Sequence, residues 1–163
     1  MLIREAQSKD LRAILDIMNE SILNTTSMYS YEVHTEATIR QWLIKKQSDK
    51  MPVFVCETNT KVVAYSSFDT FRTCDAYKFS VENSIYVHQD FQGRGIGTQL
   101  LSTLIERAKK DGYHTMIAGI DASNAGSYHF HQQLGFHEVG RMRDVGYKFG
   151  KWLELIFMQL MLS

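Results

Sequence analysis

The chain has 163 residues, of which 44% are hydrophobic and 22% charged, a composition typical of one domain spanning residues 1–163. Eighteen basic residues balance eighteen acidic ones, so no net charge attracts the protein to nucleic acid or to an anionic membrane. No apolar run approaches the ~20 residues that span a bilayer, and the charged start is unlike a signal peptide, so we expect a cytoplasmic protein without membrane or nucleic-acid partners.

The first half of the chain predicts two helices and a hairpin. Apolar residues recur at helical spacing from about residue 9 to residue 23, which predicts an amphipathic first helix. A second helix is predicted from Thr35, with its apolar side chains on one side. The β-branched and aromatic segments 53–57 and 62–71 are separated by a polar turn and predict two antiparallel strands.

The second half predicts a strand, a helix and a parallel strand in succession. A strand at 83–88 is followed by a glycine-rich loop and an amphipathic helix. The next strand, at 114–120, is expected to run parallel to the previous one, because a helix crosses over between them. A short helix at about 125–134 and strands near 136–142 and 152–161 complete the pattern. The class is α/β (α+β), with a mixed sheet containing a βαβ unit.

The glycine-rich loop is the most informative segment. Gly93, Gly95 and Gly97 let the backbone approach a ligand and leave the first amides of the following helix pointing outward. These amides and the helix dipole suit an anion such as a pyrophosphate, to which Arg94 adds a charged contact. A turn that needs glycine only for its shape is an equal alternative. A Rossmann fingerprint would require glycine at Thr98, and the Walker sequence Gly-Lys-Ser/Thr is absent.

Several segments resemble a known family. Gln92-x-x-Gly95-x-Gly97, after the apolar strand 84–88, resembles the cofactor motif of the GNAT superfamily of N-acetyltransferases, and residues 124–136 resemble its second cofactor segment. Residues 81–87 and 146–152 are similar to the phosphinothricin and methionine sulfoximine acetyltransferase branch, and the similarity extends over essentially the whole chain.

The resemblance implies a fold, a reaction and an assembly. The implied fold is a mostly antiparallel central sheet with helices on both faces. The implied reaction transfers acetyl from the co-substrate acetyl-CoA to the primary amine of a small amino-acid-like acceptor, commonly in a homodimer. The implied cofactor contacts lie on the strand, the loop and the second segment: Ile85, Tyr86, Val87, Gln92, Gly93, Arg94, Gly95, Ile96, Gly97, Thr98, Asn124 and Ser127.

Glu82 is the candidate general base, since it matches the glutamate that opens this strand in the branch. An α-amino group has a reference pKa of about 7.7 to 8.0, so near neutral pH a base must remove its proton before it can attack. The alternative is a carboxylate that only pairs a cation. A bulge or splay in the strand would free backbone groups of 85–87 for the cofactor's pantetheine arm, and the resemblance places a donor to the acetyl oxygen near Val87.

His131 is the candidate general acid. It lies seven residues after Asn124, where many GNAT proteins have a tyrosine. The departing thiolate belongs to a thiol with a reference pKa of about 8.5, and an imidazole with a reference pKa of about 6.5 can protonate it. An ordinary hydrogen-bonded histidine is an equal alternative, and Tyr128 and His129 are nearby candidates.

The acceptor site is expected to combine a cation with aromatic side chains. Arg72 is our candidate for holding a carboxylate or phosphinate, with a solvated loop cation as the alternative. Tyr31 and Tyr77 are expected to line the pocket beside Glu82, although core aromatics are the other interpretation. Tyr31 replaces a phenylalanine of the branch, and residues 32–34 depart from the run in phosphinothricin enzymes. Methionine sulfoximine, methionine sulfone or an ordinary amino acid therefore fits equally well.

Other functions stay open. A protein N-terminus, a lysine or a polyamine would use the same chemistry, and a non-catalytic acyl-CoA sensor would use the same fold. Glu82 and His131 argue against the sensor. The cysteines form no Cys-x-x-Cys motif and the histidines no His-Glu-x-x-His motif, so we predict neither a disulfide nor a metal site.

Overall fold

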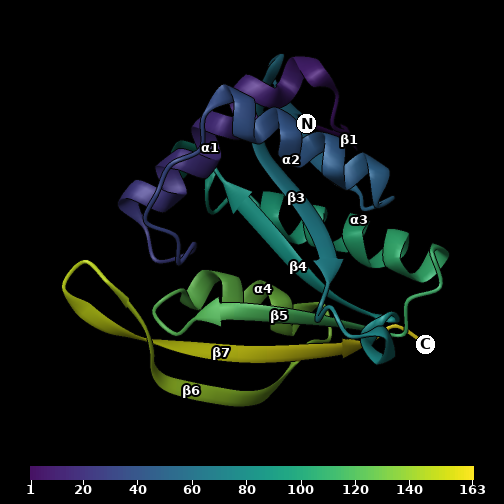
Figure 1. Ribbon diagram of the computed structural model, residues 1–163, viewed down its shortest axis with the longest axis vertical. Helices are drawn as coiled ribbons and strands as arrows, with labels where there is room; N and C mark the ends of the chain where they lie inside the picture. Colours follow the sequence, from purple (N-terminus) through teal and green to yellow (C-terminus); the bar gives the residue numbers. More distant parts are fainter.

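The computed structural model describes residues 1–163 and places seven strands in one sheet with four α-helices (Figure 1). The sheet order is β1-β2-β3-β4-β5-β7-β6, and the predicted mixed α/β fold is confirmed. None of the helices is both long and apolar enough to cross a membrane. The helices are α1 (Leu11–Asn24), α2 (Glu36–Ser48), α3 (Ile96–Lys110) and α4 (Ala125–Gln133). The strands are β1 (Leu2–Glu5), β2 (Val53–Thr58), β3 (Lys61–Thr70), β4 (Ser80–Val87), β5 (Thr115–Asp121), β6 (His137–Lys148) and β7 (Lys151–Met161).

The sheet divides at one point between its two central strands. All neighbouring strands are antiparallel except β4 and β5, which are parallel as the predicted βαβ unit requires. Their pairing covers only Ser80 to Glu82 of β4, opposite Thr115 to Ile117 of β5. Beyond this point, which we call the fork, the edge of β4 that faces β5 has no strand partner from Asn83 to Val87.

Helices cover both faces of the sheet (Figure 1). On one face, α1 and α2 pack against β2 and β3, and Ile14, Met18 and Ile22 of α1 recur every four residues in that core. On the other face, α3 buries the apolar side that its sequence predicted, and α4 packs beside it. The chain therefore builds two separate apolar layers, and the fork opens between them.

Three differences from the predicted elements occur where strands lack a clear apolar alternation. β1 was not predicted, because it is a four-residue edge strand that contains two charged residues. β4 begins three residues earlier than expected, at Ser80, where only Val81 is fully buried. β6 continues to Lys148 instead of residue 142, because it is an exposed edge strand whose register shifts between Met142 and Gly146.

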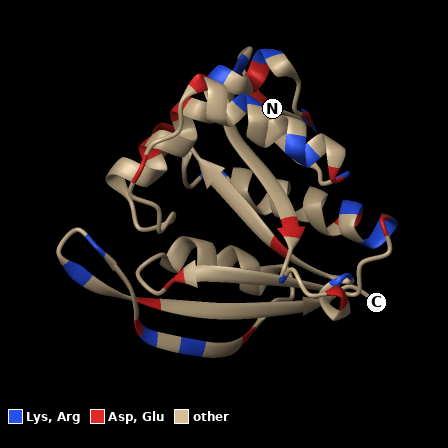
Figure 2. Cartoon of the chain, viewed as in Figure 1, with Lys and Arg blue, Asp and Glu red and all other residues tan.

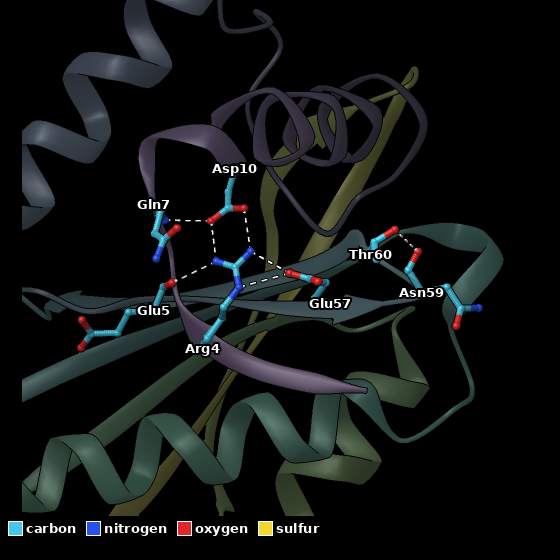
Figure 3. Close-up of polar contacts among 7 residues, drawn as sticks. All are labelled: Arg4, Glu5, Gln7, Asp10, Glu57, Asn59 and Thr60. Carbon is cyan, nitrogen blue, oxygen red and sulfur yellow. Dashed lines mark hydrogen bonds and ion pairs between the residues drawn. The ribbon is translucent and has the colours of Figure 1, made fainter.

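A network of charged side chains fastens β1 to the rest of the fold (Figure 3). Arg4 donates two hydrogen bonds to the carboxylate of Asp10, at 2.7 and 2.9 Å, and one of 2.8 Å to Glu57 on β2. Asp10 is 4% exposed and also accepts a hydrogen bond from the backbone N–H of Gln7. These bonds from Arg4 hold the pKa of Asp10 below its usual range, in spite of its burial.

Candidate functional site

A small cavity of about 130 Å³ lies at the fork. Val81 belongs to the apolar layer beneath α3, so the side chain of Glu82 projects from β4 toward the α1 and α2 side. Asn83 projects toward α4, and both side chains line the cavity. The cavity thus receives side chains from both faces of the sheet: its lining is Ser27, Glu82, Asn83, Ser84, Ile85, Tyr86, Ala118, Gly119, Ile120, Asp121, Asn124, Ser127 and His131.

Glu82 lies against β5, where Gly119 leaves room for its carboxylate. A Cβ atom at Gly119 would lie 3.0 Å from Oε1 of Glu82, so a larger residue would displace the carboxylate. Burial raises the pKa of Glu82 above its ordinary value, the cation of Arg72 opposes this increase, and Asp69 adds to it. Glu82 is half-buried, and a carboxylate with a raised pKa is better suited to accept a proton near neutral pH than a fully exposed one.

His131 is almost completely buried, with 2% of its surface exposed. Its Nδ1 lies 2.7 Å from the carbonyl oxygen of Ser127, and its Nε2 lies 3.1 Å from Oδ1 of Asn83. Asn83 in turn donates a hydrogen bond to the carbonyl of Ile117, the last β5 residue paired with β4. Burial lowers the pKa of His131 to about 4, so the imidazole is neutral near pH 7, whereas the sequence led us to expect partial protonation.

A larger groove of about 800 Å³ adjoins the fork cavity. Five residues line both spaces, so the groove and the cavity are continuous: Ser27, Ile85, Tyr86, Asn124 and Ser127. The groove brings together most of the expected cofactor residues: Ile85, Tyr86, Val87, Gln92, Gly93, Gly95, Ile96, Gly97, Thr98, Asn124 and Ser127.

The glycine-rich loop forms one end of the groove. Gly93 and Gly95 have φ angles of 72° and 75°, in the left-handed region that favours glycine, and Gly95 is the N-cap residue of α3. The first amides of α3 have no partner within the helix, and its first turn carries no acidic side chain. A Cβ atom at Gly97 would lie 3.0 Å from the ring of Phe130, so this glycine lets α3 approach α4. The loop therefore fits a pyrophosphate.

Four of the expected site residues do not line either space. Arg94 donates a 2.9 Å hydrogen bond to the carbonyl of Asp90, within its own loop, and lies over the ring of Phe91. The three expected acceptor residues make their contacts outside the cavity. The guanidinium of Arg72 lies over the ring of Phe71, Tyr77 packs on that same ring, and Tyr31 donates to the carbonyl of Tyr147.

Several lining residues were not predicted from the sequence. Gly119 carried a usable signal, because glycine inside a strand often marks a close approach by another group. Asn83 carried a signal too, because it is a polar residue on a face of β4 whose other residues are apolar. Phe149 and Lys151 reach the groove from the β6–β7 hairpin, and nothing in their local sequence indicates that contact.

Comparisons with known proteins agree with this geometry. The sequence model of the "Acetyltransferase (GNAT) family" matches residues 11–136. The chain is 42% identical to the L-amino acid N-acyltransferase MnaT of Escherichia coli (strain K12), and 41% identical to the L-methionine sulfoximine/L-methionine sulfone acetyltransferase of Salmonella typhimurium. Both alignments cover 100% of this chain and 95% of the relative.

A solved structure extends the similarity to the ligand. The structure of a GNAT superfamily phosphinothricin acetyltransferase from Sinorhizobium meliloti in complex with acetyl-CoA has a TM-score of 0.96 to this chain. The two sequences are 36% identical, and the alignment covers 99% of this chain and 88% of that one.

Proposed function

The chain belongs to the GNAT family of acetyltransferases and uses acetyl-CoA, and from this we propose that it acetylates the α-amine of a small amino-acid-like acceptor, with Glu82 as the general base. One observation carries the proposal. The groove that ends at the glycine-rich loop opens into a cavity lined by Glu82, a half-buried carboxylate with a raised pKa. A thioester in the groove and an amine beside Glu82 would therefore meet at the fork.

Each step of the proposed reaction assigns a task to this chain's own groups. The co-substrate supplies an acetyl thioester. Glu82 accepts one proton from the acceptor's ammonium and passes it to solvent, and the neutral amine then forms the new C–N bond as the C–S bond breaks. The second proton, which the nitrogen loses as it becomes an amide, neutralises the departing thiolate, which leaves as CoA thiol. The unpaired edge of β4 and the first turn of α3 supply backbone N–H groups, which hold the pantetheine arm and the pyrophosphate and donate to the acetyl oxygen.

The printed names of two relatives support an amino-acid-like acceptor, since one is an L-amino acid N-acyltransferase and the other acts on methionine sulfoximine and sulfone. Arg72 is part of the proposal as the group that holds the acceptor's carboxylate, because its charge acts on Glu82. Tyr31 and Tyr77 are proposed to contact the acceptor from the rim, where both are exposed.

We propose a homodimer as the working assembly. β6 is an edge strand, and its exposed side chains include apolar ones at Val139, Met142, Val145 and Tyr147. Unpaired strand edges and exposed apolar patches of this kind are typical of interfaces.

The acceptor is tested by measuring CoA release with L-amino acids and with their sulfoximine, sulfone and phosphinate analogues. The wild-type enzyme is expected to acetylate at least one of them, and Arg72→Ala is expected to raise KM for carboxylate-bearing acceptors about tenfold or more. Its Kd for acetyl-CoA is expected to stay unchanged, because Arg72 does not line the groove.

Arg72→Lys is the matched variant, since it keeps the charge and loses the planar fork of donors. Equal KM values in the wild type and Arg72→Ala would remove Arg72 from acceptor binding. If the enzyme acetylates peptide N-termini, lysine or polyamines but none of the amino acids tested, the proposed acceptor class is wrong.

We assign His131 a positioning role in preference to proton donation. A neutral imidazole is a very weak acid with a single N–H, and the carbonyl oxygen of Ser127, 2.7 Å from Nδ1, is an acceptor for that N–H. Its contacts join α4 to Asn83 at the fork, so its removal would loosen the geometry of the cavity.

His131→Phe is accordingly expected to lower kcat by no more than about tenfold, with the basic side of the pH profile unchanged. Steady-state kinetics between pH 6 and pH 10 check this. A loss of about 100-fold together with an altered basic limb would show that His131 donates the proton after all.

A further inference from the structure

A buried lysine on α2 approaches the same end of the sheet as Glu82. The side chain of Lys46 is 6% exposed, and its ammonium donates a 3.1 Å hydrogen bond to the carbonyl of Phe68 on β3. The same ammonium lies 2.6 Å from the carboxylate of Asp69. A buried ammonium costs free energy unless it is paired, so this contact fixes Asp69 although 63% of its side chain is exposed.

Asp69 occupies the position directly opposite Glu82. β3 and β4 are antiparallel, and Asp69 pairs in register with Glu82, so the two side chains project from the same face. Acidic positions of β3 and β4 lie side by side where these strands approach the fork (Figure 2). Side chains at such paired positions have Cβ atoms about 5 Å apart, a distance at which like charges repel.

From this arrangement we propose that Asp69, held by the buried ammonium of Lys46, strengthens Glu82 as a base by facing it across β3 and β4. The negative charge of Asp69 makes the protonated form of Glu82 more favourable, which raises its affinity for the acceptor's proton. Lys46 is a positioning residue: its ammonium contacts the carboxylate of Asp69 and the backbone carbonyl of Phe68 on β3. The inference rests on the proposed role of Glu82.

The other charged or titratable groups near Glu82 do not raise its pKa in the same way as Asp69. The loop after β3 contributes the cation of Arg72, which acts in the opposite direction. Tyr86 on β4 is a neutral phenol, because burial raises its pKa to about 12. The remaining titratable groups that line the fork cavity are Asp121 of β5, whose carboxylate bonds Tyr29 and Ser123, and the neutral His131 of α4.

The direct test is a ¹³C NMR titration of the side-chain carboxyl of Glu82, assigned by its disappearance in Glu82→Gln. In Asp69→Asn the pKa of Glu82 is expected to fall by about 0.5 to 1 unit, because a like charge has been removed. Asp69→Glu keeps the negative charge and is expected to change the pKa of Glu82 less than Asp69→Asn does. Asp16→Asn, which removes an exposed carboxylate of α1 paired with Arg12, is the control and is expected to leave the titration unchanged.

A second variant controls for the loss of stability that an unpaired, buried Lys46 could cause. Asp69→Asn leaves Lys46 without its carboxylate, so the double variant Lys46→Met/Asp69→Asn removes the pair together. This double variant is expected to lower the pKa of Glu82 by less than Asp69→Asn does, because it also removes the opposing positive charge of Lys46. The pKa still falls, because the carboxylate is the nearer of the two charges. An unchanged pKa in both variants, or an equal shift in Asp16→Asn, would overturn the inference.

The acid limb of the kcat/KM profile separates this inference from the proposed function. If Glu82 is the base, the acid limb moves to lower pH in Asp69→Asn along with the NMR titration. If the NMR pKa moves while the acid limb stays, Asp69 acts on Glu82 as inferred, and it is the assignment of Glu82 as the base that fails.

Discussion

Replacing Glu82 by glutamine is expected to reduce turnover by about 100-fold or more while leaving acetyl-CoA binding intact. Glutamine has nearly the same shape and fits the space beside Gly119, but it cannot accept a proton from the acceptor's ammonium. Glu82 does not line the groove in which we propose that acetyl-CoA binds, so the Kd for acetyl-CoA is expected to stay the same. Calorimetric titration with acetyl-CoA and steady-state kinetics across pH check the two halves of this expectation.

The pH dependence gives a second, independent readout. A carboxylate can accept a proton only when it is ionised, and burial raises the pKa of Glu82. As the pH is lowered, kcat/KM of the wild type is therefore expected to begin to decline at a pH above the usual pKa range of a glutamate. This acid limb is expected to vanish in Glu82→Gln. Glu106→Gln, on the exposed side of α3, is the control and is expected to behave as the wild type. Wild-type turnover and an intact acid limb in Glu82→Gln would exclude Glu82 as the base.

The largest effect on stability is expected from Arg4→Met. The substitution leaves the buried carboxylate of Asp10 without its two charged hydrogen bonds, and removing one partner of a buried pair costs about 3 kcal/mol or more. Urea denaturation of the wild type and the variant measures the difference. Arg12→Met is the matched control, because Arg12 makes ion pairs with Asp16 and Glu36 while remaining 71% exposed, and it is expected to change stability very little.

The same pair predicts how the difference depends on pH. Arg4 depresses the pKa of Asp10 in the folded state, so the ionised carboxylate stabilises the fold above its unfolded pKa of about 3.9. This contribution is lost as the pH falls through the lower, folded-state value. The gap in unfolding free energy between wild type and Arg4→Met is therefore expected to narrow below about pH 4. Equal losses in Arg4→Met and Arg12→Met would show that burial of Asp10 has no energetic role.

The sequence predicted the elements whose pattern is local. The spacing of Gly93, Gly95 and Gly97 before an amphipathic helix correctly indicated a strand-to-helix loop at the start of α3, and the structure adds that Gly93 and Gly95 are left-handed. The apolar periodicities of α1 and α3 likewise indicated which faces are buried. These signals depend on residues within a few turns of each other, so no knowledge of the tertiary arrangement was needed.

The fork and its surroundings depend on contacts between distant segments. The sequence around Asn83 does not indicate that the pairing of β4 with β5 stops at Ile117. The point at which the two strands separate depends on the side chains that pack on each face of the sheet. Arg94 was expected to add a contact to a phosphate, and the structure shows that it donates to the carbonyl of Asp90 within its own loop, a contact that the sequence did not indicate. The contact of Lys46 with Asp69 joins a helix to a strand 23 positions later, and local patterns carry no record of it.

The position of β7 within the sheet has a consequence for synthesis of the chain. β7 follows β5 and β6 in the chain, yet it lies between them and pairs with both. Until β7 emerges from the ribosome, β6 has no strand partner and β5 has only its short pairing with β4, so this half of the sheet cannot be completed before β7 has been synthesised. Deleting residues 151–161 would therefore remove an interior strand and leave both β5 and β6 without this neighbour.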